Sequence, residues 1–189
     1  IPRGYATVSD DAECISYREI SQIMSRQGYQ MNHASARNYL LRIMKQFAKT
    51  ILKTFESDAS AVILIGDISH YALSETEKRF PNRFYNMGIC EQSLIGFASG
   101  MASMGNLPIV HTIAPFCVER AFEQIKIDLC YQELDVTIVS VGSSFDYASL
   151  GCTHHCYEDI SILRSLPNMQ IFVPGSSAEF DYLFRQTWN

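Results

Sequence analysis

A glutamate at the junction between a short aromatic stretch and a helical pattern is the residue best placed for chemistry. Residues 83–86 are short, aromatic and bounded by turn formers, which favours a strand, and Gly88 follows as a break. From Glu91 onward, apolar residues recur at helical spacing. Glu91 therefore stands where a strand ends and a helix begins, the edge at which open α/β sheets bind ligands. The alternative is a carboxylate that only caps the helix dipole.

The run Cys152-Thr153-His154-His155-Cys156 places four potential metal ligands within five residues. No second ligand pair follows at the distance usual for zinc, so we predict that this segment holds no metal. The six cysteines of the chain are scattered and mostly lie within apolar patterns, which does not indicate a disulfide framework. Their distribution favours a reducing compartment, and we expect a cytoplasmic protein.

Several common kinds of site are excluded by missing motifs. The sequence has no Gly-x-Gly-x-x-Gly after a strand, no phosphate-binding P-loop and no Gly-x-Ser-x-Gly elbow. Between Lys126 and Arg164 it has no lysine or arginine, so this long stretch brings no cation to a phosphate group. A carboxylate, an aromatic ring and a histidine remain as the chemical groups.

The composition is that of an ordinary globular domain, with 47% hydrophobic and 19% charged residues in 189. A formal net charge of −5 without a basic block offers no electrostatic footprint for nucleic acid or an anionic membrane. No apolar run approaches the roughly 20 residues that span a bilayer. The sequence begins at Ile1 and shows no signal-peptide pattern, so we expect a soluble chain trimmed at its start.

The order of elements predicts an α/β fold with a doubly wound, mostly parallel sheet flanked by helices. Residues 1–33 are expected to form an N-terminal arm or linker with one short helix ended by Gly28, and residues 34–189 one domain. The fully apolar run at 61–65 is typical of a buried parallel strand. Further strands are predicted at 83–86, 108–113, 136–141 and 169–173, and helices at 34–55, 74–80, 91–104, 116–129, 157–166 and 177–188.

Polar or unusual residues collect where the predicted strands end. Because the carboxyl ends of parallel strands share one edge of a sheet, we expect these groups to lie together. The groups are Asp67 and Ser69, residues 88–92, residues 112–116 and residues 143–155.

Four motifs occur in a fixed order along the chain. They are Asn86-x-Gly88-Ile89-x-Glu91-Gln92; Phe116 with Arg120-Ala121-Phe122-Glu123-Gln124; Gly151-x-Thr153-His154 with Glu158-Asp159; and Leu166-Pro167-Asn168-Met169. Together they resemble the pyrimidine-binding domain of transketolase-type thiamine diphosphate enzymes. This family includes the C-terminal subunits of two-subunit transketolases and deoxyxylulose-phosphate synthase.

The resemblance implies a thiamine diphosphate-dependent transferase that moves a two-carbon ketol or acyl group. It implies that Glu91 bonds the N1′ nitrogen of the cofactor's aminopyrimidine and activates it for ylid formation. A carboxyl group partly removed from water suits this role, because it shares a proton readily with a ring nitrogen. By the same resemblance, Phe116 stacks on the pyrimidine and His154 faces the substrate. The residues implied to bind the cofactor are Glu91, Phe116, Asp67, Gly88 and Ile89.

The sequence departs from the family pattern at two places. Leu150 stands where the family usually has an aspartate that reads a sugar hydroxyl, and His155 stands in place of a glutamine. The chain also lacks the Gly-Asp-Gly motif that holds magnesium and diphosphate in the companion domain. The resemblance therefore implies that a diphosphate-binding partner subunit or domain holds the Mg²⁺, within a dimer or larger homo- or hetero-oligomer. The substrate would be a small ketose or keto acid.

Two hypotheses stay open on the sequence. The chain is either this enzyme component or a non-catalytic interaction module that kept the fold and the dimer surface. Single residues also have structural alternatives, since His154 would equally organise a loop and Phe116 would equally fill a core. We expect structural or exposed positions for His70, His111 and His33.

Overall fold

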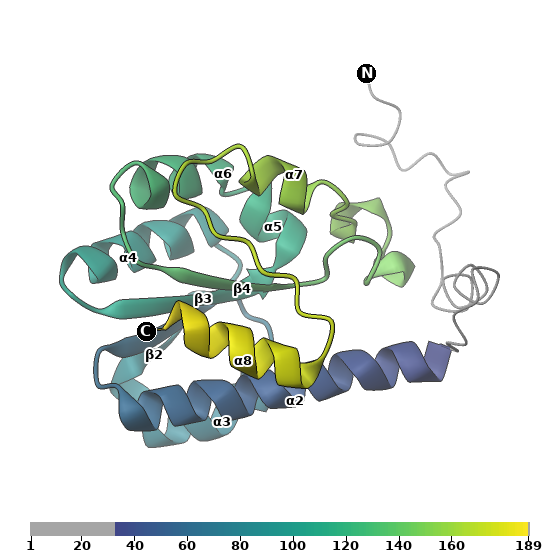
Figure 1. Cartoon of the computed structure of the whole chain (residues 1–189), viewed down its shortest axis with the longest axis horizontal. Helices are drawn as coiled ribbons and strands as arrows, with labels where there is room; N and C mark the ends of the chain where they lie inside the picture. The colour runs from purple at the N-terminus through teal and green to yellow at the C-terminus, as the bar shows by residue number, and fades with distance from the viewer. Residues whose placement is uncertain (1–32, 189) are drawn as a thin grey trace.

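The computed structural model describes residues 33–188. The helix expected within the N-terminal arm lies outside these residues. Within them the chain alternates between helices and strands, as Figure 1 shows. The α-helices and strands are α2 (His33–Ser57), β1 (Ala61–Ile65), α3 (His70–Arg79), β2 (Phe84–Asn86), α4 (Glu91–Ser103), β3 (Leu107–Ile113), α5 (Ala114–Val118), α6 (Phe122–Gln124), β4 (Thr137–Val141), α7 (Asp159–Leu163) and α8 (Ser177–Thr187).

The described strands form one parallel sheet in the order β2-β1-β3-β4. Its register aligns the last residue of β1, Ile65, with Asn86 on β2 and His111 on β3. The carboxyl ends of β1 and β2 are therefore level, β3 continues to Ile113, and the loops that follow these strands lie along one edge. The predicted parallel α/β fold is confirmed.

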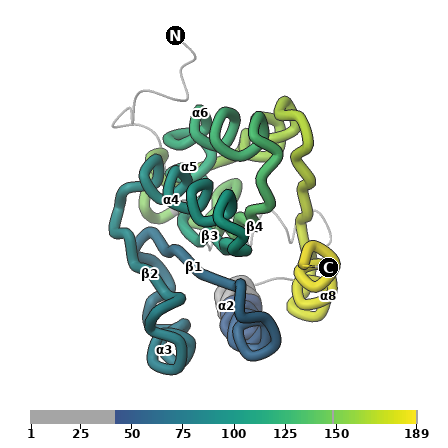
Figure 2. The backbone as a smooth tube through the Cα atoms, turned by 90° about the vertical axis from the view of Figure 1, so that its left-hand side faces the viewer, coloured from purple at the N-terminus to yellow at the C-terminus, as the bar shows by residue number. Residues whose placement is uncertain are grey.

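Helices cover both faces of the sheet, with α2, α3 and α8 on one side and α4 to α7 on the other (Figures 1 and 2). Side chains of β1 alternate between the two sides, as the pleat of a strand requires. Ile63 and Ile65 pack into the cluster built by the α2 aromatics, whereas Val62 and Leu64 pack into the cluster under α4. A strand buried on both faces reads as a continuous apolar run, which explains its sequence.

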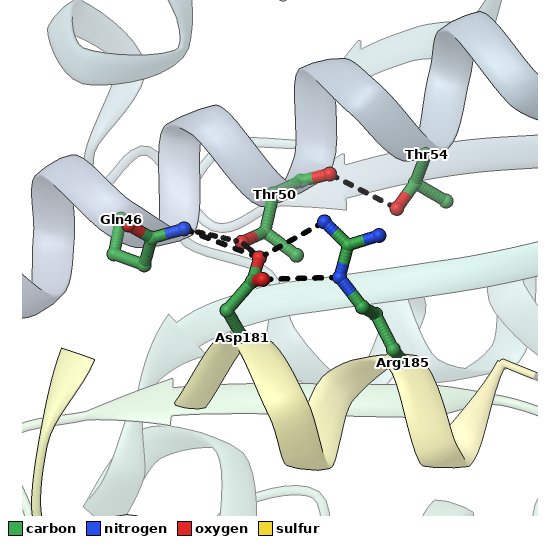
Figure 3. A network of polar contacts seen from close by, with 5 residues as sticks. All are labelled: Gln46, Thr50, Thr54, Asp181 and Arg185. Carbon is green, nitrogen blue, oxygen red and sulfur yellow. Dashed lines mark hydrogen bonds and ion pairs between the residues drawn. The ribbon is translucent and has the colours of Figure 1, made fainter. Parts of the chain in front are cut away.

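A carboxylate on α8 fastens that helix to α2 (Figure 3). Asp181 accepts hydrogen bonds from Gln46, at 3.1 Å, and from the Thr50 hydroxyl, and Arg185 bonds it from one helical turn further on. These residues are far apart in sequence, so their contact joins the last described helix to the first.

The single helix predicted over 116–129 is wrong. The segment forms α5, a break, the short α6 and a π-helix at Ile125–Cys130. At the break Ala121 leaves helical geometry, with φ −107° and ψ 20°. The stretch contains no glycine or proline that would signal this break in the sequence.

The strand predicted at 169–173 is also wrong, since the structure describes no strand there. Phe172 and Val173 are exposed. A strand exists only through pairing with a neighbour, and composition does not report whether a neighbour is present. Smaller differences occur elsewhere: α3 begins at His70 rather than 74, and α7 is shorter than the predicted 157–166. None of the described helices is long and apolar enough to cross a membrane.

Candidate active site

Glu91 is the first residue of α4, and its side chain is 1% exposed. The turn that leads into the helix passes through Gly88, whose φ of 70° suits a residue without a side chain. The Glu91 Oε2 atom accepts a hydrogen bond of 2.7 Å from Nη1 of Arg120. A carboxylate this deeply buried is costly unless it is paired, and Arg120 supplies the partner.

Arg120 also covers the ring of Phe116. The guanidinium carbon lies 4.4 Å from the ring centre, within the range of a cation–π contact. Glu91 comes from α4 and Phe116 from α5, yet one guanidinium reaches both. The motifs assigned no role to Arg120, although its spacing of four residues from Phe116 was a signal that the two side chains meet.

His154 also contacts the Phe116 ring. Its ring centre is 5.0 Å from that of Phe116, at an interplanar angle of 73°, and 6.2 Å from that of Tyr147. Burial, with a smaller effect of neighbouring His155, lowers the pKa of His154 from its ordinary value. The imidazole is therefore neutral near pH 7, and one of its nitrogens accepts hydrogen bonds. The structure thus brings the predicted Glu91, Phe116 and His154 into one neighbourhood.

The other predicted residues lie at the turns after β1 and β2. Asp67 is exposed, and its Oδ1 accepts a 3.1 Å hydrogen bond from the Asn86 side chain. Asn86 in turn accepts a 3.1 Å bond from the backbone N–H of Gly88. Asp67 therefore holds the two turns together, which is a positioning contact. Ile89 is exposed beside them.

Thr112, at the end of β3, was grouped with this edge but given no role. Its hydroxyl is buried and has no hydrogen-bond partner among the described residues. A Cβ atom added to Gly66 would lie 2.6 Å from that hydroxyl, so only glycine fits beside it. Buried polar groups are normally paired. The Thr112 hydroxyl is therefore an unpaired polar group in a closely packed part of this edge.

His111 is buried next to this position and is fully bonded. Its Nδ1 lies 2.7 Å from the Val139 carbonyl and its Nε2 lies 2.8 Å from the Ser69 hydroxyl. The Nδ1–H donates to the carbonyl, which leaves Nε2 to accept from Ser69. Burial lowers the pKa of His111 to about 4, so the ring stays neutral. These contacts fit the structural role expected for His111, and exposed His70 pairs with Glu77 on α3.

The long loop after β4 is tied at its base by Ser144 and Cys156, which exchange backbone hydrogen bonds of 2.7 and 2.9 Å. The Cys156 thiol faces Glu119, and the His155 ring packs against Phe145. Cys156 and His155 thus contact different residues. Among residues 33–188 no group of three or more His, Cys, Asp or Glu side chains is arranged to hold a metal ion.

Comparison with known proteins agrees with this geometry. The family profile described as "Transketolase, pyrimidine binding domain" matches residues 41–189. The chain belongs to that family. A solved structure described as "Split gene transketolase, inactive beta4 tetramer" superimposes on this pyrimidine-binding domain with a TM-score of 0.68 and 34% identity, over 77% of the domain's chain and 47% of the other.

Two sequence relatives are similar to this transketolase-type domain. A 33.6 kDa protein of the fasciation locus of Rhodococcoides fascians is 38% identical over 70% of this chain and 43% of its own length. An apulose-4-phosphate transketolase subunit of Actinobacillus succinogenes is 43% identical over 54% of this chain and 33% of its own. The chain therefore spans less than half the length of these relatives.

Proposed function

We propose that this chain is the pyrimidine-binding component of a thiamine diphosphate-dependent, transketolase-like transferase. The observation that supports it most strongly is the meeting of a buried carboxylate, Glu91, and an aromatic face, Phe116, around one planar nitrogen-bearing group. An aminopyrimidine is another flat group whose ring nitrogen pairs with a carboxyl group and whose face stacks on an aromatic ring.

The residues present fit this cofactor. Glu91 lies at a helix start on the carboxyl edge of the sheet, where ligands of α/β folds bind. The groups at this edge thus include a proton carrier, Glu91, and a stacking face, Phe116.

In this assignment thiamine diphosphate supplies the carbon nucleophile for two-carbon transfer. Glu91 holds a proton on its carboxyl group and shares it with the pyrimidine nitrogen, in surroundings from which water is excluded. Phe116 orients the ring by stacking. His154, neutral at neutral pH, bonds a substrate oxygen, and its contact with Phe116 fixes where that oxygen lies. Asp67 keeps the turns around Gly88 in place.

A partner subunit or domain binds the diphosphate and its Mg²⁺. The loop after β4 lies in a stretch without lysine or arginine, from Lys126 to Arg164, so it brings no cation to a diphosphate. A relative named as one subunit of a transketolase supports a two-part enzyme. We propose a hetero-oligomer in which this chain covers the pyrimidine half of the cofactor and acts on a ketose or keto acid.

The test is turnover by the Glu91→Gln variant in the complex with a diphosphate-binding subunit. The change is nearly isosteric but removes the shared proton, so we expect a loss greater than the roughly 10² to 10⁴ usual for a general acid–base group. Glu123→Gln, on α6, is the matched control and should keep the wild-type rate. Circular dichroism should show both variants folded. A Glu91→Gln enzyme with near wild-type turnover would refute the assignment.

A further inference from the structure

Arg120 makes both of the contacts that the proposed function assigns to the cofactor's pyrimidine. Its guanidinium is flat, donates an N–H to the Glu91 carboxylate at 2.7 Å and stacks 4.4 Å from the centre of the Phe116 ring. A flat cation with N–H donors is the closest likeness to an aminopyrimidine that a side chain offers. Under the proposed function the ring and the guanidinium would both use Glu91 and Phe116.

We propose that Arg120 is a placeholder: it holds the Glu91 and Phe116 contacts while no cofactor is bound and gives them up when the pyrimidine binds. This inference rests on the proposed function, because it needs the pyrimidine to use Glu91 and Phe116. It assigns Arg120 a positioning role: the side chain keeps the site formed and its buried charge compensated until the ring arrives.

The contacts of Arg120 allow it to leave. The bond to Glu91 uses one guanidinium nitrogen, so it is not the bidentate arrangement that holds arginine most firmly. The side chain is 39% exposed and reaches water without further rearrangement. Arg120 also lies between α5 and α6, where the helix is interrupted, rather than within a regular turn. Its departure breaks one ion pair and one cation–π contact.

Departure of Arg120 would leave the Glu91 carboxylate without its cationic partner. Glu91 is too deeply buried to remain an unpaired carboxylate, and such a group takes up a proton instead. The described groups that interact with Glu91 are Arg120 and Cys117 of α5. Burial, and then the nearby Glu91 charge, raises the pKa of the Cys117 thiol to about 12, so this thiol does not titrate near neutral pH. Binding of the ring should therefore be accompanied by uptake of a proton at Glu91.

The experiment is calorimetric titration of thiamine diphosphate, with Mg²⁺ present, into the cofactor-free complex of this chain with its diphosphate-binding subunit. Titrations at pH 7.5 in two buffers of different ionisation enthalpy give the number of protons taken up. We expect about one proton per site for the wild type. For Arg120→Met we expect uptake near zero, because the ring no longer displaces a cation from Glu91, and affinity about tenfold tighter, because the competing contacts are gone.

Two further variants complete the design. Arg120→Lys keeps a cation beside Glu91 and so folds even if the methionine variant does not; it should take up a proton as the wild type does, yet bind more tightly because it leaves Phe116 uncovered. Arg164→Met removes the same charge from an exposed position after α7 and should match the wild type.

The outcomes separate the inference from the function. Weaker binding by both Arg120 variants would mean that Arg120 holds the ring, and would overturn the placeholder. Unchanged proton uptake in a folded Arg120→Met complex would overturn it as well. If the wild-type complex binds no thiamine diphosphate, the proposed function fails and the inference fails with it.

Discussion

His111 and His154 lie at the same edge of the sheet but in opposite surroundings. Both nitrogens of His111 are bonded within the protein, to Val139 and Ser69, and its ring is closed off from water. His154 is only partly buried and packs against the aromatic rings of Phe116 and Tyr147. The first can only support the fold, whereas the second remains accessible to a substrate.

The buried state of His111 predicts how stability depends on pH. Its pKa of about 4 in the folded protein lies below the ordinary 6.5. Between these two pH values His111 is protonated in the unfolded chain and neutral in the folded one. Its contribution is complete above about pH 6.5 and is lost as the pH falls toward 4, on the order of 3 kcal/mol in total. Denaturant unfolding at pH 7 and 4.5 should show a smaller loss for His111→Asn than for the wild type. Equal losses in the wild type and in His111→Asn would contradict the assignment.

Leu150 predicts the choice of donor. Its side chain is 56% exposed on the loop after β4 and offers no acceptor to a sugar hydroxyl. A hydroxyl left unpaired on binding costs on the order of 1 to 3 kcal/mol, a ten- to hundredfold effect on its use. Leu150→Asp should therefore improve ketose-phosphate donors relative to others, whereas His154→Ala should harm all donors alike. A donor panel measured on the complex tests this, and an unchanged ranking in Leu150→Asp would show that the loop does not set specificity.

Residue patterns located part of the candidate site and missed part of it. Glu91, Phe116 and His154 were found because ordered motifs mark them in the sequence. Arg120 and Thr112 were not assigned, because their significance lies in what surrounds them. The motif contains Arg120, but only the fold shows that its guanidinium turns back to a carboxylate 29 positions earlier. No sequence pattern reports that the Thr112 hydroxyl lacks a partner among the described residues.

At the scale of elements, the interrupted helix after β3 is the feature that sequence periodicity did not reveal. Residues 116–129 carry good helix formers, and their apolar spacing predicts one continuous helix. Their tertiary contacts override this preference: Arg120 pairs with Glu91 while Ala121 and Ile125 are buried under the sheet. A π-helix then follows, a form often found at functional sites.

The hydrogen bonds that attach α8 to α2 predict a measurable contribution to stability. Asp181 accepts from Gln46, Thr50 and Arg185, and these hydrogen bonds, with that of Arg185 the largest, lower the pKa of its carboxyl group. Asp181→Asn removes the charge and turns an acceptor into a donor, so we expect a loss of about 1 to 3 kcal/mol in the free energy of unfolding. Denaturant titration measures it. Asp135→Asn, an exposed position before β4, should change stability by less than about 0.5 kcal/mol. An equally small effect at Asp181 would mean that apolar packing alone holds α8.

At the scale of the whole molecule, the sheet was predictable because burial on both faces leaves a clear mark on composition. The run at Ala61–Ile65 is apolar throughout, and every one of its residues is buried. The strand predicted at 169–173 is absent, since an apolar run becomes a strand only beside a paired neighbour. The chain spans less than half the length of the Rhodococcoides and Actinobacillus relatives and of the split-gene transketolase, so its assembly with a partner belongs to the proposed function rather than to the fold.

In the proposed function this chain binds the pyrimidine of thiamine diphosphate and a partner binds the diphosphate. Calorimetric titration of thiamine diphosphate with Mg²⁺ into the chain alone, the diphosphate-binding subunit alone and their complex tests it most directly. Because the loop after β4 brings no cation to the diphosphate, we expect weak or undetectable binding to the chain alone and micromolar binding to the complex. Micromolar binding to the chain alone, or equal affinity for the partner with and without the chain, would contradict the claim.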